Sequence, residues 1–153
     1  MKYSLKGFKP VTTIQGLGLV YLEQAAVEIA AGDAIFDNGS GYATNVGTAF
    51  AATFRGIAAE DSDLSAGSDG DDKIAIIPAS ADIRYMVKNE SGTAAAQTDI
   101  GELVDLESND GVDVTDVTLV EWGFLIDEID ISALAVAANT PGFVIGRFQK
   151  TPQ

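Results

Sequence analysis

The segment Leu103-Val104-Asp105-Leu106-Glu107-Ser108-Asn109-Asp110-Gly111-Val112-Asp113-Val114 gives the clearest indication of the fold. Apolar and polar residues alternate on both sides of the tetrapeptide at 108–111, which is rich in residues that favour turns. Alternation of this kind is typical of a half-solvated strand, and a turn between two such runs predicts a hairpin. We therefore expect strands at 103–106 and 112–114.

The same pattern of apolar runs and turn residues extends through most of the chain. Short apolar runs separated by turn residues recur about every ten residues, as in sandwiches and barrels. Further strands are predicted at 17–22, 27–30, 34–36, 53–58, 73–77, 83–88, 117–120, 122–126 and 143–148. Residues 21–31 are rich in Ala and Glu and could be helical, but we interpret them as strand; 131–138 predicts a short turn of helix. The expected fold is all-β and mainly antiparallel, a small β-barrel or β-tulip or sandwich with an extended N-terminal arm and at most one or two short helices.

Composition excludes several kinds of chemistry. The 153 residues suit one domain, and the 46% hydrophobic content is normal for a globular chain. Cys and His are both absent, which removes thiolate chemistry, the usual general base near neutral pH and the commonest zinc ligand. The net charge of -14 opposes binding to nucleic acid or to an anionic membrane. The chain also lacks an apolar run long enough for a membrane span or a signal peptide, so we expect no membrane partner.

The first ten residues differ in composition from the rest. Three of the nine basic residues lie there, interleaved with apolar side chains, and the first acidic residue is Glu23. We interpret 1–10 as an arm outside the main core and 11–153 as a single β-rich domain; the alternative is a frayed terminus without a role. The candidate contact residues of the arm are Lys2, Tyr3, Leu5, Lys6, Phe8 and Lys9.

Two acidic segments could carry chemistry. In 60–72 the carboxylates and hydroxyls are dense enough to suggest a calcium loop, with ligands at Asp61, Asp63, Ser65, Asp69 and Asp72. The sixth position of that loop is Ala66 instead of glycine, so our default is a solvated acidic loop without metal or cofactor. In 99–130 eleven acidic residues alternate with apolar ones, which indicates a half-solvated sheet more than the paired carboxylates of a glycosidase. We therefore expect no enzymatic activity.

Three motifs resemble, in order, those of the decoration (cement) proteins on the heads of tailed bacteriophages. The first is Ala31-Gly32-Asp33-Ala34-Ile35-Phe36 with Gly41-Tyr42-Ala43-Thr44. The second is Phe54-Arg55-Gly56-Ile57-Ala58-Ala59-Glu60-Asp61, a Gly- and Ser-rich loop, and Asp72-Lys73-Ile74-Ala75-Ile76. The third is Ile100-Gly101-Glu102-Leu103-Val104-Asp105-Leu106, a strand near Trp122, and Phe143-Val144-Ile145-Gly146-Arg147-Phe148. The likeness covers about 27–148, and it departs at Asp63-Leu64-Ser65, where the family pattern has an Asn.

The resemblance implies a structural role on the virion. Such a protein is made in the host cytoplasm, forms a homotrimer and binds the outside of the capsid, where it bridges subunits of the major capsid protein and stabilises the expanded shell. The arm would be the natural clamp. The alternative is a calcium- or carbohydrate-binding β-module of an adhesin-like or tail protein, and a carboxylate-based hydrolase is a third possibility.

Overall fold

The computed structural model describes residues 7–11, 18–47, 50, 53–117, 121–130 and 142–152. Over these residues the chain is all β apart from one 3-10 turn, η1 (Gln97–Asp99), which confirms the predicted fold class. The strands are β1 (Lys9–Pro10), β2 (Val20–Glu23), β3 (Glu28–Ile29), β4 (Ala34–Asp37), β5 (Ala43–Thr44), β6 (Phe54–Ala58), β7 (Ser62–Asp63), β8 (Lys73–Pro78), β9 (Tyr85–Asn89), β10 (Leu103–Ser108), β11 (Gly111–Asp113), β12 (Trp122–Asp130) and β13 (Phe143–Lys150).

Five strands from the first half of the chain form a small barrel, which we call the amino-terminal barrel. Their order is β2-β8-β6-β4-β5, and each neighbouring pair is antiparallel. A bridge between Gln24, which follows β2, and Ala43 of β5 joins the two edge strands. The short strands β3 and β7 form a separate pair.

The second half forms a larger sheet in the order β1-β9-β11-β10-β12-β13. Because β9 also pairs with β13, the strands β9, β11, β10, β12 and β13 make a closed circuit, the carboxy-terminal barrel. The pair β9–β11 is parallel, whereas the other strand pairs that the structure describes are antiparallel. The predicted hairpin is confirmed, since β10 and β11 pair antiparallel with Ser108 opposite Gly111.

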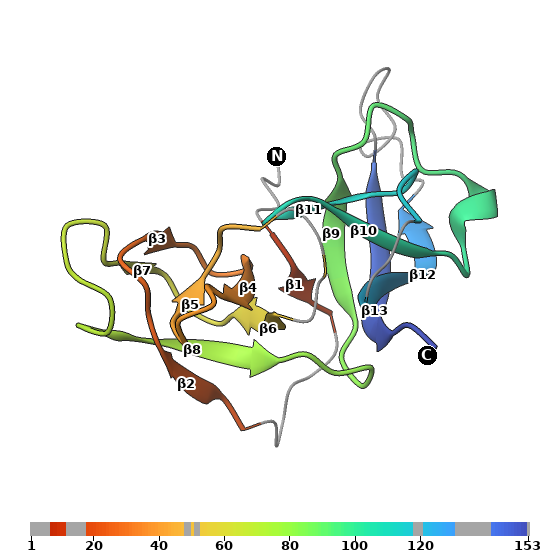
Figure 1. Ribbon diagram of the computed structural model, residues 1–153. Coiled ribbons are helices and arrows are strands. Elements are labelled where there is room, and N and C mark those ends of the chain that lie inside the picture. The colour runs from red at the N-terminus through yellow and green to blue at the C-terminus, as the bar shows by residue number, and fades with distance from the viewer. Residues whose placement is uncertain are drawn as a thin grey trace.

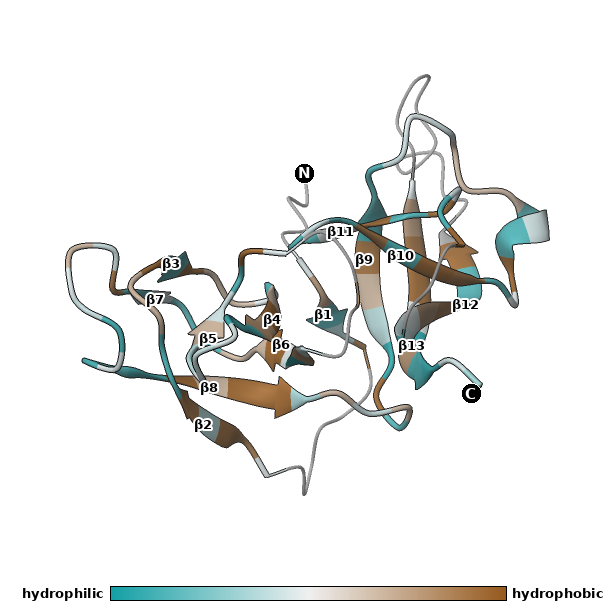
Figure 2. Cartoon of the chain, viewed as in Figure 1, coloured by the Kyte–Doolittle hydropathy of each residue, from teal (hydrophilic) through white to brown (hydrophobic). Residues whose placement is uncertain are grey.

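The two barrels share one hydrophobic core. Figure 1 shows them as two adjoining bodies with β1 between them. The larger core cluster combines Phe36, Phe54 and Ile77 of the amino-terminal barrel with Tyr85, Phe124, Phe148 and other buried residues of the carboxy-terminal barrel. A smaller cluster belongs to the amino-terminal barrel and comprises Ile29, Ile35, Ala43, Ala58, Ile74 and Ile76. Hydrophobic residues accordingly fill most of the strands in Figure 2.

Phe8 corrects part of the arm hypothesis. Its side chain is only 1% exposed, and its ring lies 5.3 Å from that of Phe148, 5.5 Å from Phe124 and 6.1 Å from Phe50. The backbone N–H of Phe8 donates to the carbonyl of Gly32. Burial of an aromatic side chain away from water stabilises the fold. Because Phe8 is buried in this way, it is a core residue and not a contact for an outside partner.

Gly7 explains how the chain reaches this position. It has φ +66°, and a Cβ atom there would lie 2.4 Å from the carbonyl oxygen of Gly32. Only glycine fits such a close approach with a left-handed backbone. The residue before Phe8 thus lets the chain enter the junction between the barrels.

The predicted strands agree with the structure at most positions. Each overlaps a strand except that at 117–120, where Val117 is exposed and outside any strand and the other residues lie outside the described part. The interpretation of 21–31 as strand is confirmed by β2 and β3. The short strands β1, β5 and β7 were not predicted because two residues give no periodicity. The helix predicted at 131–138 lies outside the described residues.

Candidate interaction surface

The structure describes two of the six candidate arm residues. Phe8 is buried as above, and Lys9 is exposed in β1, opposite Met86 of β9. Lys2, Tyr3, Leu5 and Lys6 lie outside the described residues, so their proposed contact role stays a prediction. Among the candidates that the structure describes, only Lys9 has a side chain exposed for a partner.

The acidic loop at 60–72 uses its carboxylates to organise the backbone. Asp61 accepts a hydrogen bond from the N–H of Ala31, and Asp69 accepts one from Ala26, which ties the loop to the segment after β2. Asp63 accepts from the N–H and hydroxyl of Ser65, and the hydrogen bond from this hydroxyl is the largest cause of its lowered pKa. These acids serve separate turns, and no three acidic side chains converge as metal ligands within the described ranges.

Like the acids of the 60–72 loop, the described acidic residues at 99–130 serve separate sites. Asp127 lies between Arg84 at 3.5 Å and Arg147 at 3.6 Å, whereas Glu121 pairs with Lys150 at 3.7 Å. Each of these ion pairs joins neighbouring strands or a strand to a flanking loop. Among the described residues, these carboxylates form ion pairs with basic side chains, which matches a charged sheet surface.

Asp105 is the exception, because it is buried. The residue is 4% exposed, and its Oδ1 accepts hydrogen bonds from the N–H of Phe50 at 2.6 Å and of Leu106 at 2.8 Å. Burial raises the pKa of this carboxyl, and the nearby charge of Asp116 adds to the rise, although the two hydrogen bonds oppose it. The geometry assigns Asp105 a structural role, since it fixes Phe50 against the core.

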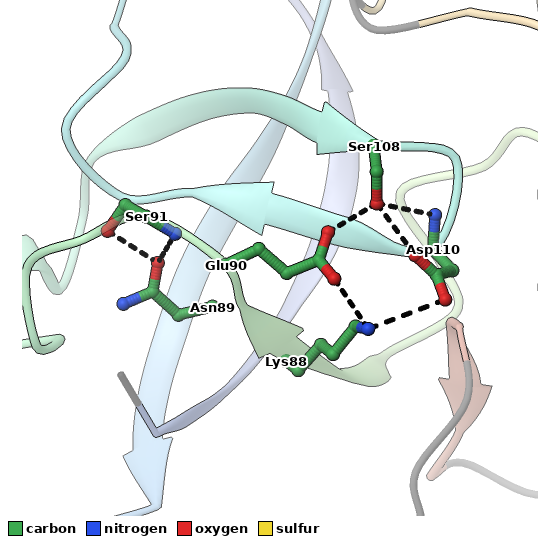
Figure 3. A network of polar contacts seen from close by, with 6 residues as sticks. All are labelled: Lys88, Asn89, Glu90, Ser91, Ser108 and Asp110. Carbon is green, nitrogen blue, oxygen red and sulfur yellow. Dashed lines mark hydrogen bonds and ion pairs between the residues drawn. The ribbon is translucent and has the colours of Figure 1, made fainter. Parts of the chain in front are cut away.

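A polar network joins the ends of β9, β10 and β11 (Figure 3). Lys88 Nζ lies 2.5 Å from the carboxylate of Glu90 and 3.5 Å from that of Asp110. The hydroxyl of Ser108 contacts both carboxylates, at 2.6 Å for Asp110. Beside it, the buried Asn89 accepts hydrogen bonds from the N–H and hydroxyl of Ser91.

The carboxylates of this network favour the charged form of Lys88. Burial lowers the pKa of Lys88, but the hydrogen bonds and charges of Glu90 and Asp110 outweigh it, so the pKa lies above its ordinary value. The cluster links the parallel pair β9–β11 to the β10–β11 turn.

A groove of about 750 Å³ opens on the amino-terminal barrel. Its lining includes Ala25, Phe36, Val46 and Asp37. The carboxylate of Asp37 accepts from the N–H groups of Gly39 and Gly41 and pairs with Arg55 at 3.6 Å, and the hydrogen bond from Gly39 is the largest cause of its lowered pKa. Asp37 is therefore engaged in holding the turn after β4, and the other acidic residue of the lining, Asp69, accepts a hydrogen bond from the N–H of Ala26.

The outer edge of β2 carries a run of exposed apolar residues. Leu19, Val20 and Tyr21 are consecutive and 45%, 41% and 63% exposed, and a Cβ atom at Gly18 would meet nothing within 4 Å. The inner edge of β2 pairs with β8. Within the described residues, the outer edge meets another strand only beyond β2, at the Gln24 bridge. We call residues 18–22 on this edge the β2 edge.

Sequence reasoning found this strand but not its exposure. Residues 17–22 read as an ordinary apolar run, and periodicity does not distinguish a central strand from an edge strand. The one available signal was the absence of charge: residues 18–22 carry none, in a chain in which 21% of residues are charged.

The chain matches no protein-family model and no curated protein sequence. Among the described residues, no helix is long and apolar enough to cross a membrane.

Proposed function

We propose that this protein decorates the outside of a tailed-phage head, where it bridges neighbouring major capsid subunits and stabilises the expanded shell. The three ordered motifs that resemble the decoration family support this function, and an all-β fold is compatible with it. The observation that carries the proposal is the β2 edge, which presents uncharged, exposed residues on a chain of net charge -14. An apolar surface on an otherwise acidic protein is typical of a site for another protein.

The proposal includes a homotrimer. A trimer would engage several shell sites at once, and linked binding events can raise overall affinity by about 10²–10⁴ over a single contact. Weak individual contacts would then suffice for retention on the head. The acidity would keep the free protein soluble at the concentrations needed for full occupancy.

Co-sedimentation with shells of the cognate major capsid protein tests the function. The purified full-length protein is mixed with expanded empty shells, and unexpanded shells serve as the control. We expect saturable pelleting with expanded shells only, and a trimer in sedimentation of the protein alone. A folded protein that stays in the supernatant at all concentrations would refute the shell-binding proposal, and a monomer would refute the trimer.

A further inference from the structure

Within the part of the chain that the structure describes, the β2 edge has few of the features by which proteins protect an exposed strand. Edge strands usually avoid pairing with other chains through a charged residue, a proline, a bulge or a covering segment. The strand contains no proline and one charged residue, the exposed Glu23 at its end, and its pairing with β8 is regular from Val20↔Ile76 to Glu23↔Lys73. The edge therefore offers backbone N–H and C=O groups together with apolar side chains.

We propose that the β2 edge accepts an extended segment of the shell subunit as an added strand, an inference that rests on the proposed function. Strand addition to an open edge gives affinity through main-chain hydrogen bonds and specificity through alternate side chains. Four residues at 19–22 extend over about 14 Å, which accommodates a short strand. Beyond them the edge is closed, because Gln24 already bridges Ala43 of β5.

The chemistry of the edge defines the segment that fits. The added strand must be apolar at alternate positions, so that it covers the exposed side chains of Leu19 and Tyr21. It should lack acidic residues, because Glu23 stands exposed at the end of β2 and the chain carries a net charge of -14. A Lys or Arg opposite Glu23 would complete the match, since opposite charges across neighbouring strands are favourable.

Tyr21→Lys tests the proposal, with Val117→Lys as the matched control. Both replace an apolar residue by lysine at sites of similar exposure, 63% and 57%, but only Tyr21 lies on the β2 edge. We expect Tyr21→Lys to weaken binding to expanded shells by about tenfold or more, because a lysine on an edge strand disfavours pairing. Val117→Lys should bind like the original chain, and circular dichroism should show both variants folded.

Hydrogen exchange of the full-length protein supplies the second measurement. Strand addition should slow the exchange of alternate backbone amides at 19–22 when expanded shells are bound, whereas side-chain contact alone would leave these amides unprotected. Shell binding that is insensitive to Tyr21→Lys and gives no protection at 19–22 would overturn the inference and leave the proposed function standing.

The same variants also show whether the β2 edge binds a second copy of this chain instead of the shell. If Tyr21→Lys changes the oligomeric state of the protein before any shell is added, the edge pairs with a second copy, and the assignment to the shell is overturned. Absence of binding by the unmodified protein would instead refute the proposed function itself. The two failures are therefore distinguishable.

Discussion

Replacement of Phe8 by alanine should strongly destabilise the folded protein, although Phe8 lies near the start of the chain. The ring is 1% exposed and packs against four other aromatic rings, those of Phe50, Tyr85, Phe124 and Phe148, at centroid distances of 5.3–6.2 Å. Deletion of a buried aromatic side chain costs about 3–5 kcal/mol, because apolar burial is lost and a cavity remains. That loss is a large part of the roughly 5–15 kcal/mol by which domains are stable.

Urea unfolding followed by the fluorescence of Trp122, the only tryptophan, measures this free energy. For a chain of this size each kcal/mol corresponds to about 2–4 °C, so the expected fall in Tm is about 6–20 °C. Lys9→Ala is the control, because Lys9 is the exposed neighbour, and surface changes of this kind stay within about 0.5 kcal/mol. A loss below about 1 kcal/mol for Phe8→Ala would refute the placement of Phe8 in the core. The same packing predicts that deletion of residues 1–9 destabilises the fold, whereas deletion of 1–6 retains Phe8.

Three further predictions concern single features. Asp105→Asn should be more favourable to the free energy of unfolding at pH 7 than at pH 4. Because the pKa of Asp105 is raised in the folded state, this carboxyl contributes its full stability below the ordinary pKa of 3.8, and the contribution is lost as pH rises through the folded pKa. Unfolding curves of the two proteins that shift in parallel with pH would contradict the burial of its charge. Gly7→Ala should cost about 1–3 kcal/mol in urea unfolding, because the φ of +66° and the approach to Gly32 both exclude a side chain; an unchanged midpoint would show that the chain enters the core differently. Calcium added after EDTA should leave Tm unchanged, since the carboxylates at 60–72 hold separate turns; a rise with calcium concentration would favour the calcium-binding module instead.

The strands could be predicted because their signals are local. The hairpin of β10 and β11 follows from alternation around a turn at 108–111, and the apolar runs of β6, β8 and β13 are long enough to show the pattern. Which strands meet could not be predicted, because pairing of β9 with both β11 and β13 depends on tertiary packing and leaves no local trace.

The candidate surface was predictable only in part. Composition distinguished residues 1–10 from the rest of the chain, but it did not show that one aromatic side chain of this lysine-rich segment is buried. Phe8 reaches the core because the backbone at Gly7 passes close to Gly32. Asp105 read as one more solvated acid in an alternating strand, yet the loop that brings Phe50 over it makes it a buried hydrogen-bond acceptor. In both cases a contact with a distant segment decided the environment.

The contact between Phe8 and Phe148 also bears on biosynthesis. The two rings are separated by 140 positions (148 - 8), and they meet at a centroid distance of 5.3 Å. A nascent chain on the ribosome therefore holds Phe8 without its partner until β13 has been synthesised. Contacts of such long sequence separation slow folding and prolong the exposure of apolar surface. We expect assembly of the central aromatic cluster to be a late event in folding, and a chain stalled before β13 to be a substrate for chaperones.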